Sequence, residues 1–156
     1  MPLYTFTAIN PQGQEINGSV EAPDQNQAAA ETRLDDQIAA ARQKVQSGRS
    51  AVAEAGRLVA AHEQRVWLLR SRVAAGTSSS AQLAQQVATM RQDAQRIAGV
   101  IRAMEADIAA LDRQIAAAPG GQAKQALLQA RGELAEQKAR LQAQLQSLNA
   151  AIGQAG

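Results

Sequence analysis

The chain has 156 residues, no cysteine and a formal net charge of +2. Without cysteine it has no disulfide bond, thiol nucleophile or thiolate metal site. Aromatic residues make up 2% of the sequence, too few to line a deep ligand pocket or to stack on many bases. Its longest strongly apolar run, about Val66 to Leu69, is far shorter than the roughly 20 residues that span a bilayer. The start also lacks the pattern of a signal peptide, so composition favours a cytoplasmic protein without a membrane span.

Residues 1–23 differ from the rest of the sequence and are predicted to form a β-hairpin module. Leu3 to Ile9 is rich in β-branched and aromatic residues, Asn10-Pro11-Gln12-Gly13 is a turn signal, and Glu15 to Glu21 can return as a second strand. Because a lone two-stranded hairpin is marginally stable in water, we expect it to pack on a helix or on a partner.

Two long runs follow in which apolar residues recur every 3.5 residues, from Ile38 to Val73 and from Leu83 to Ala118. This repeat is typical of helices packed along a narrow seam. A Gly76-to-Ser80 break separates the runs, and Pro119-Gly120-Gly121 ends the second. We therefore predict a mainly α fold, a long antiparallel coiled-coil hairpin plus a third helix. The coiled-coil region is 24–156, with helices at about 24–75, 79–118 and 122–152.

Pairing the two runs at the break, so that paired residue numbers add up to 156, sets small residues against large ones. Gly48 then faces Ile108 and His62 faces Ala94, as interdigitating cores require. Flanking charges agree with this register, although exposed ion pairs contribute little stability. The ion pairs that it predicts are Glu63–Arg91, Arg49–Glu105, Arg42–Asp112 and Arg65–Asp93.

The third helix carries a leucine every seven residues, and this stripe has two interpretations. It can fold back on the second helix and cover Trp67 and Leu68, or it can pair with a second copy of the chain in a homo-oligomer. The sequence leaves the two open. The stripe consists of Leu127, Leu134, Leu141 and Leu148.

The only histidine, His62, falls on a seam position. A catalytic or metal-binding role needs partner residues, and the heptad pattern arranges none around it, so we interpret His62 as a polar residue that sets the register. The carboxylates lie on helix flanks, where solvated charges are usual. We predict no catalytic residue, no metal, no cofactor and no enzymatic activity.

Charge is unevenly distributed, which leaves a second function class open. Residues 1–30 contain no lysine or arginine, so the helical remainder is basic, at about +5. A basic helical rod binding nucleic acid or an anionic membrane surface is the alternative. Trp67 and Leu68, beside three arginines, are a candidate contact, although burial against the third helix is favoured.

The amino-terminal 30 residues resemble the type II secretion F / type IV pilus assembly PilC family. The similarity rests on an aromatic-x-aromatic-x-Ala pattern, then a glycine, then Gly-x-apolar-x-Ala-x-Asp before an alanine-containing helix. It implies a docking module for a bacterial pilus or secretion assembly, and the family's membrane spans have no counterpart here. The matching residues are Met1-Pro2-Leu3-Tyr4, Phe6, Ala8, Gly13, Gly18, Val20, Ala22, Asp24 and Ala28.

The stretch from Arg65 to Leu83 resembles, more weakly, the hairpin tip of HlyD-type membrane fusion proteins. Arg65 and Leu69 fit that pattern, but Gly76 stands where serine is expected, and the lipoyl halves are missing. The predicted function is therefore a non-enzymatic structural or adaptor protein that acts through protein–protein contacts. The expected partner-binding residues are Tyr4, Phe6, Val20, Trp67 and Leu68.

Overall fold

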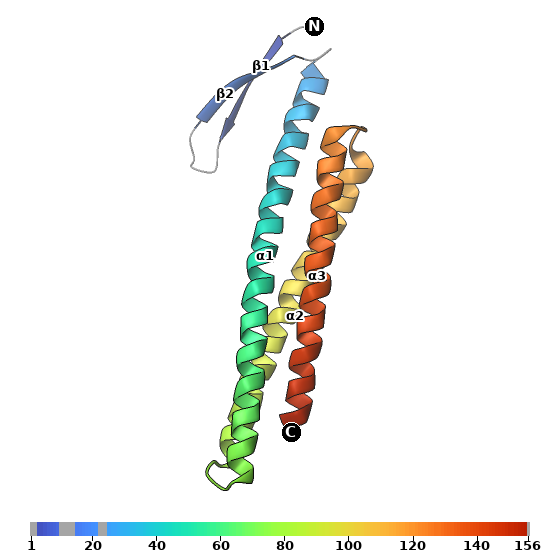
Figure 1. The fold of residues 1–156 in the computed structure, drawn as a ribbon. Coiled ribbons are helices and arrows are strands. Elements are labelled where there is room, and N and C mark those ends of the chain that lie inside the picture. The colour runs from blue at the N-terminus through green and yellow to red at the C-terminus, as the bar shows by residue number, and fades with distance from the viewer. Residues whose placement is uncertain (1–2, 10–14, 22–24, 156) are drawn as a thin grey trace.

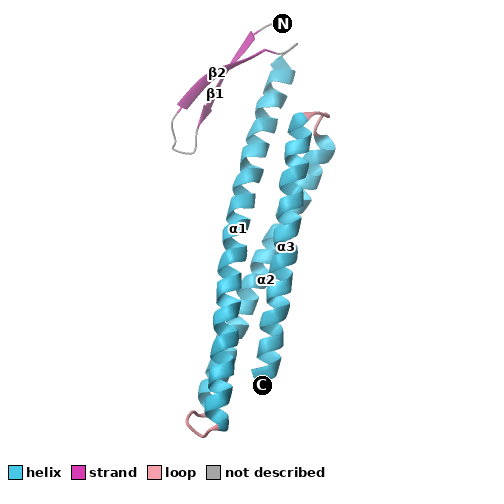
Figure 2. Cartoon of the chain, in the orientation of Figure 1, coloured by secondary structure: helices cyan, strands magenta, loops and turns pink. Residues whose placement is uncertain are grey.

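The computed structural model describes residues 3–9, 15–21 and 25–155, and the side chains of residues 32–155. It confirms a mainly α fold, in which three helices form a packed bundle (Figures 1 and 2). The predicted turn at residues 10–13 lies outside the described residues. The elements are β1 Leu3–Ile9, β2 Glu15–Glu21, α1 Gln25–Ala74, α2 Ser80–Ala117 and α3 Gln122–Ala155.

The strands β1 and β2 pair in antiparallel register, with Tyr4 opposite Val20 and Phe6 opposite Gly18. Between the helices, the chain reverses twice at the glycine-containing breaks. Gly76 in the first turn has φ 75° and Gly121 in the second has φ 115°, a conformation that a side chain disfavours. As a result α2 runs opposite to α1, and α3 runs parallel to α1 (Figure 1).

The third helix packs within the chain. Its four seven-spaced leucines, Leu127, Leu134, Leu141 and Leu148, are at most 1% exposed. Both α1 and α2 pack more extensively against α3 than against each other. The leucine stripe is thus occupied inside one copy, and a homo-oligomer through these four leucines has no support in the structure.

The predicted seam positions of α1 and α2 are all buried or half-buried, but the predicted register is wrong at the position where it can be checked most directly. Gly48 faces Met104, one helical turn nearer the α1–α2 turn than the expected Ile108. The register prediction considered only two helices. In the bundle α3 fills part of the seam, which lets α1 and α2 shift along each other.

The predicted ion pairs are not formed among the described side chains. Three of their members bind α3 instead, because α3 brings its own charged flanks next to both other helices. Arg49 pairs with Glu133 at 3.5 Å, and Glu105 pairs with Lys138 at 3.4 Å. The Nε of Arg131 donates to Asp112 Oδ1 at 2.7 Å. This hydrogen bond raises the pKa of Arg131.

None of the described helices is both long enough and apolar enough to cross a bilayer.

Candidate protein-binding surfaces

The three amino-terminal residues expected to bind a partner are brought together by strand pairing. Tyr4 and Phe6 are two residues apart on β1, and Val20 on β2 lies opposite Tyr4. Because successive positions on a strand alternate between faces, positions 4, 6 and 20 share one face of the hairpin. Their side chains are outside the described set.

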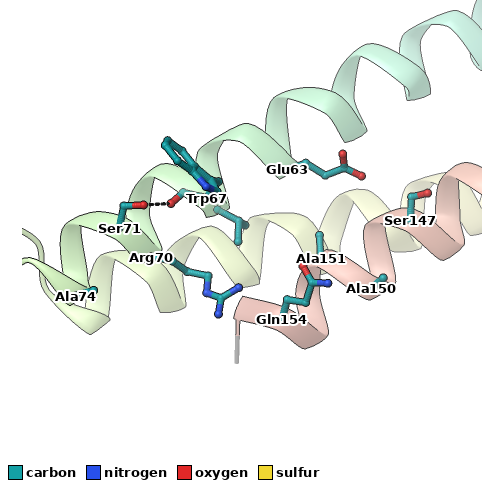
Figure 3. Close-up of a pocket in the computed structure, with 10 residues that line it drawn as sticks. Glu63, Trp67, Arg70, Ser71, Ala74, Ser147, Ala150, Ala151 and Gln154 are labelled. Atoms are coloured by element: carbon teal, nitrogen blue, oxygen red, sulfur yellow. Dashed lines mark hydrogen bonds between the residues drawn. The ribbon is translucent and has the colours of Figure 1, made fainter.

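Trp67 is 69% exposed, so the expectation that the third helix buries it is wrong. It follows the seam residue Val66 on α1, and the alanines of α3 that pack at this level, Ala151 and Ala155, are small and buried. Figure 3 shows the Trp67 ring on the outer side of α1, with Ser71 Oγ donating to the Trp67 carbonyl at 3.0 Å. Leu68 is half-buried. Trp67 is therefore more accessible to a binding partner than Leu68 is.

A groove of about 690 Å³ runs beside Trp67 between α1 and the end of α3. Val66 and the alanines of the two helices give it an apolar floor. Arg70 extends from α1 toward the end of α3, where Gln154 lies (Figure 3). The α1–α2 turn reaches past the end of α3 (Figure 1). Its lining is Glu63, Val66, Trp67, Arg70, Ser71, Ala74, Ser147, Ala150, Ala151 and Gln154.

His62 has partners, contrary to the expectation that none surrounds it. It is 7% exposed, and its Nε2 hydrogen bonds to Asp93 Oδ2 at 2.7 Å. Gln86 Nε2, an amide nitrogen that can only donate, lies 2.8 Å from His62 Nδ1. Both ring nitrogens of His62 therefore contact side chains of α2. Asp93, itself 8% exposed, was missed because two-helix pairing assigned it to Arg65.

Two glutamines of α3 form a second set of polar contacts, one buried and one half-buried, that the leucine pattern did not reveal. Gln137 Nε2 donates to the Val45 carbonyl at 2.9 Å, and Gln144 Nε2 donates to the Val52 carbonyl at 3.3 Å. The two glutamines are seven residues apart on α3, and the two valines are seven residues apart on α1. Gly48 makes room for the first, because a Cβ there would collide with Gln137 Oε1. These contacts set the parallel register of α1 and α3.

Among the described residues, no three His, Cys, Asp or Glu side chains gather in a way that could hold a metal ion.

Comparison with known proteins finds a sequence similarity for one part of the chain. Residues 1–33 match the sequence model described as Type II secretion system protein F, N-terminal domain. This confirms the resemblance seen in the amino-terminal pattern, and it leaves residues 34–156 unmatched. No curated protein and no solved structure matches the chain.

Proposed function

We propose that the chain is a non-enzymatic adaptor whose amino-terminal module binds a protein of a bacterial type II secretion or type IV pilus assembly. The observation that carries the proposal is the match of residues 1–33 to the N-terminal domain of type II secretion system protein F. The helical bundle then serves as a rigid spacer that holds a second surface away from the docked module.

The register of the hairpin supports a docking role. Alternation separates apolar positions on one face from mostly polar positions on the other. Among the described elements, the strands pack extensively only with each other, although such a hairpin needs cover to be stable. A partner is therefore expected to cover the apolar face. Its positions are Tyr4, Phe6, Ala8, Ile16, Gly18 and Val20.

The bundle suits a spacer because of its length and packing. At 1.5 Å per residue, the 50 residues of α1 extend about 75 Å. Seam residues buried from Ala41 to Leu69 resist bending over that part of the helix, since interiors pack at crystal-like density. The end of α1 that follows the hairpin and the α1–α2 turn thus lie at opposite ends of the rod (Figure 1).

The test is capture of assembly proteins by the full chain in the native host. We expect Tyr4→Ala with Phe6→Ala to abolish recovery of secretion or pilus components, measured by quantitative mass spectrometry. The matched control is Thr5→Ala with Thr7→Ala, which changes the opposite face of the same strand and should leave recovery intact.

Circular dichroism shows whether each variant keeps its helices. Equal recovery by both double variants, with helicity unchanged, would contradict docking through the apolar face. Recovery of no secretion or pilus component by the unaltered chain would contradict the proposed context itself.

A further inference from the structure

Two segments of the sequence carry opposite net charge. We call residues 1–36 the acidic start and residues 64–92, which surround the α1–α2 turn, the basic tip. Figure 1 shows the beginning and end of α1 at opposite ends of the bundle. The acidic start contains Glu15, Glu21, Asp24, Glu31, Asp35 and Asp36 against one basic residue, Arg33, whereas the basic tip contains Arg65, Arg70, Arg72 and Arg91 and no acidic residue.

The arginines of the basic tip form no ion pair among the described side chains, although Glu63 lines the same groove as Arg70. The segment of α3 that reaches this end, residues 141–155, contains no charged residue at all. Among the described side chains, none of the four arginines forms an ion pair, whereas elsewhere Lys44 pairs with Asp107 at 2.9 Å and Arg131 with Asp112 at 2.7 Å. The tip is thus a cationic surface without a partner in the described part of the chain.

The basic tip overlaps a partly apolar groove at Arg70. This arginine lines the groove between α1 and α3 together with Val66, Trp67 and Glu63. Trp67 and Leu128 are the large apolar side chains that stand out as exposed in the described part of the chain, and Trp67 is the more exposed. Trp and Arg are enriched among residues that dominate protein interfaces, which indicates a protein-binding groove.

We propose that the basic tip of one copy binds the acidic start of a second copy of the chain. Charge complementarity between the two ends identifies the occupant, since the acidic start has six acidic residues against one basic residue. Asp35 and Asp36 are exposed on α1, so they are accessible to another molecule. Such a head-to-tail contact produces a closed dimer or an open chain of copies.

A second copy fits the tip better than a membrane or a nucleic acid. The turn at residues 76–80 has no large apolar side chain to insert into lipid, so Trp67 would be the only side chain of the tip suited to insertion. Trp67 is also the only aromatic residue of the basic tip. Proteins that bind single-stranded nucleic acid stack several bases on several aromatic side chains, which the tip does not offer.

The first experiment measures the mass of the purified full chain by sedimentation velocity at low and high salt. We expect association that grows with concentration at about 0.05 M NaCl and is lost at about 0.5 M, where the screening length is much shorter. Either a dimer or a longer species supports the proposal. A chain that stays monomeric at low salt overturns it.

Charge reversal tests which surfaces are used. Arg65→Glu with Arg70→Glu should weaken self-association at least about tenfold, since two attractive contacts become repulsive. The matched control, Arg57→Glu with Arg102→Glu, changes the net charge equally at exposed positions outside the tip. If this control is as damaging as the tip variant, general charge and not the tip drives association, and the proposal fails.

Mixing restores the contact if the pairing is correct. Asp35→Lys with Asp36→Lys should also prevent self-association. Mixed with the Arg65→Glu, Arg70→Glu chain, it offers its unaltered basic tip to the unaltered acidic start of that chain, which restores one of the two contacts. Association regained only in the mixture supports the proposal, and a mixture of monomers overturns it.

The second-copy contact and the proposed adaptor function are tested separately. Self-association uses the purified chain alone, whereas docking on a secretion or pilus protein is read by capture from the host. Vesicles of anionic lipid and a single-stranded oligonucleotide serve as probes. Binding of either one through Arg65 and Arg70, by a chain that remains monomeric, would reassign the tip and overturn the second-copy proposal.

Discussion

The body of the bundle, where all three helices lie side by side, and its basic tip at residues 64–92 share one heptad pattern. They nevertheless present two kinds of surface. In the body, α3 lies beside α1 and α2, so leucines such as Leu134 are buried and flanking charges pair. At the tip α3 ends, Val73 and Leu83 are only half-buried, and Trp67 is exposed. Exposure therefore depends on where the third helix stops. Apolar periodicity alone would have treated both regions alike.

The sharpest test of this contrast is Leu134→Ala in the body. Leu134 is 1% exposed, and removing a fully buried leucine side chain costs about 2–5 kcal/mol. We expect a large loss in the free energy of unfolding, measured by urea titration followed by circular dichroism. Leu128→Ala is the control, because Leu128 on the same helix is 46% exposed. Equal losses would mean that α3 does not pack within the chain.

A second test concerns the buried polar pair at the border between body and tip. His62→Leu leaves the Asp93 carboxylate buried with only the Arg96 guanidinium nearby, at 3.5 Å. Leaving a buried acceptor without its hydrogen-bond donor costs about 1–3 kcal/mol, and more for a charged group. Replacing both residues, His62→Leu with Asp93→Leu, should recover most of this loss. If the double variant is less stable than the single one, the pair contributes net stability that an apolar layer cannot replace.

Two glycines test the close approach of α1 and α3 in the body. Gly48→Ala places a Cβ against Gln137, and such overpacking costs about 1–3 kcal/mol. Gly132→Ala meets open space and should be stabilising by about 0.5–1 kcal/mol through helix propensity. Thermal unfolding of the two variants gives the comparison. A stabilised Gly48→Ala chain would show that α3 sits farther from α1 than the structure indicates.

The smallest effect on stability is expected at the tip. Trp67→Ala removes an exposed side chain, so the free energy of unfolding should change by no more than about 0.5 kcal/mol. The same variant should weaken self-association several-fold, because the ring lines the groove assigned to a second copy. Sedimentation velocity and urea titration on one sample separate the two outcomes, and a destabilised chain would place Trp67 in the core.

Local signals in the sequence were sufficient for the elements and their apolar faces. The helix ends lie within three residues of the predicted ones, because glycine and proline act on their own neighbours. Every predicted seam position of α1 and α2 is buried or half-buried, since a 3.5-residue repeat places those positions on one side whatever packs there. The amino-terminal resemblance was also readable directly from residue pattern and spacing.

The partners of these faces were decided only by the tertiary structure. The heptads of two helices fit each other in several registers, and the sequence gives no measure of how strongly a third helix competes. In the bundle, Gly48 therefore faces Met104 and not the predicted Ile108, and Arg49 pairs with Glu133 and not with Glu105. Asp93 bonds to His62 and not to Arg65. Trp67 lies on the outer side of α1 and stays exposed beside α3. Periodicity is a property of one helix, whereas register and exposure belong to all three helices together.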